Sequence, residues 1–200
     1  GRSISDYIET VERLSHEAVD MLEINISCPN VSHGGITFGT NVDSVRDITS
    51  QVKVHSKKPV IMKLSPNVTD ITEIAKAAED AGADALSLIN TVTGMKIDIN
   101  KRCFAIANKT GGMSGPAIKP VALRMVYQVA NAVKIPVIGM GGIVTADDAI
   151  EFLLAGATMV SVGTANFFNP DASIMVVDGI EKYLEKNGFG DVNEIIGLVK

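Results

Sequence analysis

Residues that can carry chemistry gather in one short segment, Asn25-Ile26-Ser27-Cys28-Pro29-Asn30. Under the period-two alternation of a strand, Asn25 and Ser27 share one face, and Cys28 comes where the strand gives way to a proline turn. A cysteine at that point can meet a ligand, although many lone cysteines are simply small buried hydrophobic residues. The flanking asparagines favour the ligand-binding interpretation, because planar amide groups suit a small polar ring.

A lysine and several glycines form the next candidate groups. Lys63 ends the apolar run PVIMKL, where its charge needs a partner unless the side chain reaches solvent. Gly141-Gly142 and Gly163-Thr164 each precede a predicted helix, so their backbone N–H groups and the helix dipoles can bind a phosphate. Glycines at such turns can also serve only to allow a positive φ. Two such pairs in succession favour the phosphate site.

The remaining cysteine and the three histidines give weaker indications of a functional site. Cys103 has no asparagines beside it and is predicted to be structural, as a small buried residue. His16 and His55 are predicted to lie on the surface, whereas His33 follows Cys28 and can line the entrance to a site. No metal site is expected, since the chain has two cysteines and no C-x-x-C pair.

The composition limits the class of protein. With 200 residues, 46% of them hydrophobic and 20% charged, the chain can form one globular domain. A net charge of -5 without a run of Lys or Arg argues against a nucleic-acid partner. The chain lacks a signal-peptide pattern and an apolar stretch of roughly 18 to 20 residues, so we expect a cytoplasmic protein with no membrane partner.

Five short apolar runs are predicted to be the buried strands that position these residues. They begin at Met21, Pro59, Ala83, Ile135 and Thr158. Helical patterns alternate with them, which predicts consecutive βα units and a parallel sheet. The polar and glycine-rich residues follow the strands directly, at the ends where barrel active sites lie. A doubly wound parallel sheet is the alternative.

Two of the predicted helices have capping-box spacing at their starts. These are Asp70 with Glu73 and Thr145 with Asp148. The chain should open on a helix near residues 6–19 and close on one near 172–186, and the glycines in two Ala-Gly-Ala segments, Gly82 and Gly156, should end helices. The connection 90–117 is too long for a routine loop and is therefore predicted to be functional.

Six motifs, in order along the chain, resemble class 1 dihydroorotate dehydrogenases and are closest to the class 1B catalytic subunit. They are EINISCPNVSHGGITFGT, KLSPNVTDI, LINTVTGMKIDI, NKTGGMSGPAIKPVALRMVYQV, IPVIGMGGI and VSVGTANF. The likeness extends from Asp6 to about Leu184. It implies a (β/α)8 TIM barrel with FMN at its top. Residues 1–200 are then expected to be the carboxy-terminal two-thirds of this single domain, with about five βα units, and the first strands are expected to precede Gly1.

The resemblance also implies roles for residues that match its motifs. Cys28 is the implied base, which takes a proton from C5 of dihydroorotate while the hydride at C6 passes to N5 of FMN. The implied substrate contacts are Asn25, Asn30, Asn90 and Thr91. The implied FMN contacts are Asn25, Lys63, Ile89, Gly115, Gly141, Gly142, Gly163 and Thr164.

Class 1B resemblance implies partners as well. It implies a homodimer joined to a subunit that bears FAD and an iron–sulfur cluster, giving a heterotetramer that passes electrons to NAD in pyrimidine (UMP) biosynthesis. The alternatives are a fumarate-dependent class 1A enzyme, the pyrimidine-reducing domain of dihydropyrimidine dehydrogenase, and a non-catalytic flavin-binding scaffold.

An incomplete barrel has a physical consequence. The first strand, near residues 21–27, should have an open edge that must be covered or must associate with another chain. The isolated chain should also hold FMN weakly and oxidise dihydroorotate poorly.

Overall fold

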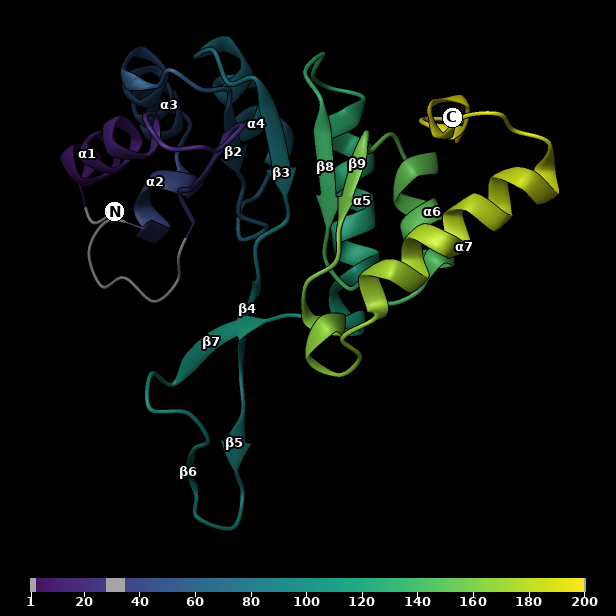
Figure 1. The fold of residues 1–200 in the computed structure, drawn as a ribbon. Helices are drawn as coiled ribbons and strands as arrows, with labels where there is room; N and C mark the ends of the chain where they lie inside the picture. Colours follow the sequence, from purple (N-terminus) through teal and green to yellow (C-terminus); the bar gives the residue numbers. More distant parts are fainter. Residues whose placement is uncertain (1–2, 28–34, 200) are drawn as a thin grey trace.

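A five-stranded parallel sheet forms the centre of the computed structural model, which describes residues 3–27 and 35–199 (Figure 1). The five predicted strands are confirmed, and they lie in the order β1-β2-β3-β8-β9. Their bounds are β1 Leu22–Asn25, β2 Val60–Lys63, β3 Ala85–Leu88, β8 Val137–Met140 and β9 Met159–Ser161.

Helices connect these strands, and each of α3 to α6 contacts the next helix along the chain. Strands in sequential order with helices in the same order are the arrangement of a barrel wall, whereas a doubly wound sheet reverses its strand order. The doubly wound alternative is therefore wrong. The helices are α1 Ile4–Leu14, α2 Gly35–Thr40, α3 Val42–His55, α4 Ile71–Asp80, α5 Lys119–Ala130, α6 Ala146–Leu154 and α7 Ala172–Asn187, with short 3-10 turns η1 Pro116–Ile118, η2 Thr164–Phe167 and η3 Val192–Ile195.

The core lies between the sheet and these helices. Met62, Leu86 and Leu88 are fully buried on the central strands, and Ile48 and Phe152 meet the same core from α3 and α6. Burying a side chain of this size stabilises the fold by roughly 1.5–3 kcal/mol. Packing on the helix side therefore fixes the strands, and the polar residues of the pocket lie at the strand ends.

Helix boundaries follow local hydrogen bonding. The capping box of Thr145 and Asp148 is confirmed, and Gly82 and Gly156 have the positive φ predicted after helices, 94° and 109°. The box predicted for Asp70 and Glu73 is wrong, because Asp70 accepts hydrogen bonds from N–H and Oγ1 of Thr72 at 2.8 and 2.7 Å instead.

The opening helix is shorter than predicted. It ends at Leu14, because Ser15 is buried and its hydroxyl accepts a hydrogen bond from N–H of Lys57, after which the chain turns toward β1. The closing helix α7 agrees with its predicted range of 172–186. No described helix is both long enough and apolar enough to cross a bilayer.

The long connection predicted at 90–117 forms a projection of two successive antiparallel ribbons, which we call the arm (residues 92–113). In the arm, β4 (Val92–Met95) pairs with β7 (Thr110–Met113), and β5 (Ile97–Asp98) pairs with β6 (Cys103–Phe104). Figure 1 shows the arm extending from the end of the sheet at which β3 terminates. Cys103 is exposed on β6, so its prediction as a buried structural residue is wrong: a two-stranded ribbon has no second layer to cover it.

Strand β1 is an edge of the described sheet, as predicted. Part of its edge is covered, because the hydroxyl of Tyr7 in α1 donates a hydrogen bond to the backbone carbonyl of Asn25 at 2.8 Å. Tyr7 also packs edge-on against Phe38 of α2, with ring centroids 6.4 Å apart. The first turns of the chain thus hold the carboxyl end of β1, where Asn25 stands.

Candidate active site

The carboxyl ends of β2, β3, β8 and β9 surround a pocket of about 210 Å³ at the base of the arm. Residues predicted to bind substrate or cofactor line it together although they are spread over 102 positions of the chain, from 63 to 164. They are Lys63, Ile89, Asn90, Thr91, Gly115, Gly141, Gly142, Gly163 and Thr164. Cys28, Asn30 and His33 lie outside the described residues.

Asn90 joins this pocket to the end of β1. Its Nδ2 donates hydrogen bonds to Oδ1 of Asn25 at 3.0 Å and to Oγ of Ser27 at 2.8 Å, and its Oδ1 accepts one from N–H of Thr91 at 2.7 Å. Oδ1 of Asn25 also accepts from N–H of Ser27 at 3.1 Å. The predicted common face of Asn25 and Ser27 is therefore confirmed. Amides held by several hydrogen bonds present a fixed set of donors and acceptors to a ligand.

Lys63 has the charged partner that was expected from its position at the end of an apolar strand. Nζ of Lys63 lies 3.2 Å from Oε1 of Glu23, and the two side chains are 22% and 37% exposed. The pair forms because Asn25 is the register partner of Lys63, which puts Glu23 two residues earlier on the same face of the neighbouring strand. The sequence reasoning missed Glu23, although the alternation that grouped Asn25 with Ser27 also includes it.

Glycines shape the opposite side of the pocket. Gly115, Gly141 and Gly142 have positive φ values of 92°, 127° and 79°. A Cβ at Gly142 would lie 2.9 Å from both the carbonyl oxygen of Gly115 and the backbone nitrogen of Lys119, so two loops meet there without room for a side chain. A Cβ at Gly163 would meet no atom within 4 Å, so that glycine faces open space.

The helix predicted directly after Gly163-Thr164 is only the four-residue turn η2, and α7 begins at Ala172. The prediction that a helix dipole contributes to phosphate binding at Gly163-Thr164 is therefore wrong. The donors that this loop offers to a phosphate are its backbone N–H groups. Oγ1 of Thr164 donates to Oγ of Ser114 at 2.9 Å, which connects this loop to the end of the arm.

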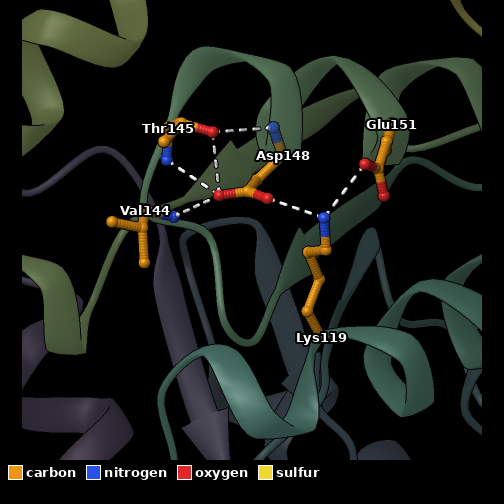
Figure 2. Close-up of polar contacts among 5 residues, drawn as sticks. All are labelled: Lys119, Val144, Thr145, Asp148 and Glu151. Atoms are coloured by element: carbon orange, nitrogen blue, oxygen red, sulfur yellow. Dashed lines mark hydrogen bonds and ion pairs between the residues drawn. The ribbon is translucent and has the colours of Figure 1, made fainter.

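A charged cluster lies behind the glycine loops, and we call Lys119, Asp148 and Glu151 the lysine clamp (Figure 2). Nζ of Lys119 donates to Oδ1 of Asp148 at 2.6 Å and to Oε1 of Glu151 at 2.9 Å. The other oxygen of Asp148, Oδ2, accepts from N–H of Val144 at 3.0 Å and from N–H of Thr145 at 2.9 Å. Asp148 thus binds the loop after β8 with one oxygen and the start of α5 with the other.

The charges of the clamp are stabilised by these contacts. Burial alone would raise the pKa of Asp148, but the hydrogen bonds from Lys119, Thr145 and Val144 lower that pKa from 3.8 to about 2. The hydrogen bonds to Asp148 and then Glu151 raise the pKa of Lys119. Both groups are therefore charged at neutral pH.

A polar contact not singled out from the sequence fixes the base of the arm. Oδ1 of Asn67 accepts from N–H of Thr93 at 2.9 Å, and its Nδ2 donates to the carbonyl of Thr91 at 3.1 Å. A Cβ at Gly112 would overlap the side chain of Thr91, so β7 crosses Thr91 closely. Pro66-Asn67 belongs to a quoted family motif, yet nothing in the spacing indicated a contact across 24 residues.

A parallel sheet in sequential order, with polar side chains and glycine loops converging at its carboxyl ends, defines a protein of the α/β-barrel class with a ligand site at that end. The sequence profile of the family described as dihydroorotate dehydrogenase matches residues 1–184. The chain belongs to this family.

Curated relatives agree with the resemblance predicted from the motifs. The chain is 67% identical over 200 residues to the catalytic subunit of dihydroorotate dehydrogenase B (NAD(+)) from Lachnoclostridium phytofermentans, covering all of this chain and 67% of that protein. It is 59% identical over 197 residues to the protein of the same name from Alkaliphilus oremlandii, covering 98% of this chain and 65% of that protein. The chain thus spans about two thirds of the length of these relatives.

A solved structure supports the predicted fold. The crystal structure of DHODH from Eimeria tenella in complex with ferulenol superposes with a TM-score of 0.82 at 26% sequence identity. The match covers 98% of this chain and 57% of the Eimeria chain. The α/β-barrel architecture, of which five βα units are visible here, is confirmed.

Proposed function

We propose that the protein containing this chain oxidises dihydroorotate to orotate in pyrimidine biosynthesis, with FMN as its cofactor. The observation that supports this proposal most strongly is one pocket that unites the side-chain amide of Asn90, the hydroxyl-bearing Thr91, the cation of Lys63 and the glycine loops. The names of the relatives support the reaction, since they are catalytic subunits of a dihydroorotate dehydrogenase.

The residues fit the phosphate end of FMN. Gly141, Gly142, Gly163 and Thr164 bring backbone from two neighbouring loops to one side of the pocket, where an anion can accept hydrogen bonds from N–H groups. The backbone approach at Gly142 leaves no space for a side chain, and the open side of Gly163 leaves space for a ligand. Bound FMN would supply the acceptor for the hydride that leaves the substrate.

Lys63 is the cation proposed to face the flavin ring. Its ammonium group can stabilise negative charge that develops nearby during reduction. The contact with Glu23 limits the positions that Nζ can take, so the charge is held at the carboxyl end of β2. Ile89, at 3% exposure, contributes an apolar wall beside it.

The amide cluster is proposed to orient the substrate. Asn25, Asn90 and Thr91 offer donors and acceptors suited to the planar amide edges of dihydroorotate, and Asn30 is assigned to the same role by its motif. Because Nδ2 of Asn90 donates to both Asn25 and Ser27, the cluster has one preferred arrangement.

Cys28 follows Ser27 directly and is the proposed base that removes the proton from C5. A thiol serves as base only when its thiolate is accessible near working pH, and neighbouring hydrogen-bond donors favour that form.

We further propose a cytoplasmic homodimer that passes electrons to NAD through a second subunit with FAD and an iron–sulfur cluster. The name of the relatives, which combines NAD(+) with the words catalytic subunit, supports NAD as acceptor and a second subunit. The homodimer, FAD and the iron–sulfur cluster rest on the class 1B resemblance of the motifs. Fumarate-dependent oxidation remains the competing proposal for the electron acceptor.

Release of the cofactor and a comparison of acceptors test these proposals. The purified protein should release free FMN on denaturation, and it should oxidise dihydroorotate with an artificial acceptor. Turnover with fumarate alone would replace the NAD proposal, and turnover of uracil or thymine in place of dihydroorotate would favour the dihydropyrimidine dehydrogenase alternative. A protein without flavin, or with FAD in this pocket, would refute the assignment of the glycine loops.

A further inference from the structure

The lysine clamp lies where the two halves of the glycine-lined wall meet. One half is the loop after β8, Gly141 to Thr145, and the other is the turn from Gly115 to Lys119 that leads into α5. These segments touch through backbone, because the Cα of Gly142 faces the carbonyl of Gly115 and the backbone nitrogen of Lys119. Backbone contact alone gives little resistance to movement of one segment along the other, because the glycines have no side chains that interlock.

The side chains of the clamp supply the missing connection. Asp148 caps α6 and binds N–H of Val144 and Thr145 through Oδ2, and it binds Lys119 through Oδ1. Glu151, one turn further along α6, gives Lys119 a second acceptor. Charge-assisted hydrogen bonds of this kind are stronger and more directional than neutral ones. A displacement of either glycine segment would therefore stretch at least one of them.

We propose that Lys119 is a positioning residue for the cofactor phosphate: through Asp148 and Glu151 it holds the Gly115 turn and the Gly141–Thr145 loop in the arrangement that binds phosphate. Lys119 does not line the pocket, whereas Gly115, Gly142 and Val144 do, so its effect on a ligand passes through the backbone that it fixes. This inference rests on the proposed use of FMN.

A purely structural lysine offers a matched comparison. Lys53 of α3 forms an ion pair with Asp84, and Asp84 also accepts a hydrogen bond from N–H of Val60 at 2.7 Å, at the amino end of β2. The Lys53 and Lys119 side chains are 35% and 24% exposed. Lys53 thus anchors backbone through a carboxylate as Lys119 does, but at the end of the sheet away from the pocket.

The test measures binding of FMN and of riboflavin, which lacks the phosphate, to the full-length apoprotein and its variants. Lys119→Met removes the charge and keeps most of the apolar stem. It should weaken FMN binding roughly tenfold, the equivalent of one lost charged hydrogen bond, and change riboflavin binding less than about twofold. Lys119→Arg should restore most of the preference for FMN. Lys53→Met should lower Tm and leave the ratio of the two affinities unchanged.

The outcomes separate this inference from the proposed function. If the unmodified protein prefers FMN and Lys119→Met keeps the same ratio, or loses both ligands equally, Lys119 is only structural and the inference is overturned while the proposed cofactor stands. If the unmodified protein binds riboflavin as tightly as FMN, no phosphate site exists and both proposals fail. If Lys119→Met does not fold, Asp148→Asn carries the same comparison, because it removes the charged acceptor of Lys119. An unchanged ratio in Asp148→Asn would then overturn the inference.

Discussion

Gly142→Ala is expected to be the most damaging single-methyl change in the glycine loops. Gly142 has a φ of +79°, and an alanine in the left-handed region costs about 1–2 kcal/mol. The new Cβ would also stand 2.8 Å from Cβ of Lys119 and 2.9 Å from two backbone atoms. Because backbone cannot rotate away as a side chain can, we expect a total loss of about 2–4 kcal/mol in the free energy of unfolding.

Urea unfolding followed by circular dichroism would measure this loss, and two glycines separate its causes. Gly188, after α7, has a similar φ of +76° and no atom within 4 Å of a built Cβ, so Gly188→Ala should show the conformational cost alone. Gly163→Ala places its methyl in open space at a negative φ of −107°, so it should lower FMN affinity more than stability. Equal losses from Gly142→Ala and Gly188→Ala would refute the close approach of the two loops.

Two further predictions concern the proposed base and the clamp. Cys28→Ala should lower the rate of dihydroorotate oxidation by a factor of about 10² to 10⁴ while FMN stays bound. Cys103→Ala, on the exposed arm, should leave that rate unchanged. A fully active Cys28→Ala enzyme would exclude Cys28 as the base. Because the folded pKa of Asp148 is lowered from 3.8 to about 2, its carboxylate should contribute about 2 kcal/mol of stability above pH 3.8 and lose it between 3.8 and 2. The difference in unfolding free energy between the unmodified protein and Asp148→Asn should therefore shrink from pH 5 to pH 2, and a difference independent of pH would contradict the charged pair.

The central sheet was predictable because its strands are short, apolar and bounded by turn residues. Parallel strands in this architecture are buried against helices, so a strand such as residues 59–64 is recognised as a continuous apolar run. It needs no alternation of apolar and polar residues. Strand order was less accessible, since a barrel wall and a doubly wound sheet share the same βα pattern. The βα pattern and the polar residues at the strand ends favoured the barrel with a doubly wound sheet as the alternative, and the motifs of the family implied the barrel directly.

The arm shows where pattern reasoning fails. Its strands are two to four residues long, and side chains such as Met95, Ile97 and Phe104 are exposed. No continuous apolar run or helical spacing marks such a ribbon. Gly111 and Gly112 lie in β7, and the side chain of Thr91 leaves no room for a Cβ at residue 112. Length alone identified this connection as unusual.

Backbone positions in the site were easier to predict than side-chain partners. The glycines and Lys63 lie at strand ends, and every parallel strand brings its carboxyl end to the same place. The partners Glu23, Asn67 and Asp148 depend on register and on how loops cross, which the order of residues does not specify. Asp148 was recognised as a helix cap, but its second oxygen binds Lys119, 29 positions earlier.

The position of each residue around the pocket predicts whether its substitution changes flavin binding or the rate of oxidation. At about 210 Å³ the pocket is smaller than the roughly 300–1,000 Å³ of complete small-molecule sites. The groups proposed to hold the phosphate all belong to described loops, whereas the proposed base Cys28 and the proposed substrate contact Asn30 lie outside the described residues. Changes at Gly142 or Lys119 should therefore alter flavin affinity, and changes around Asn90 and Cys28 should alter the rate of oxidation.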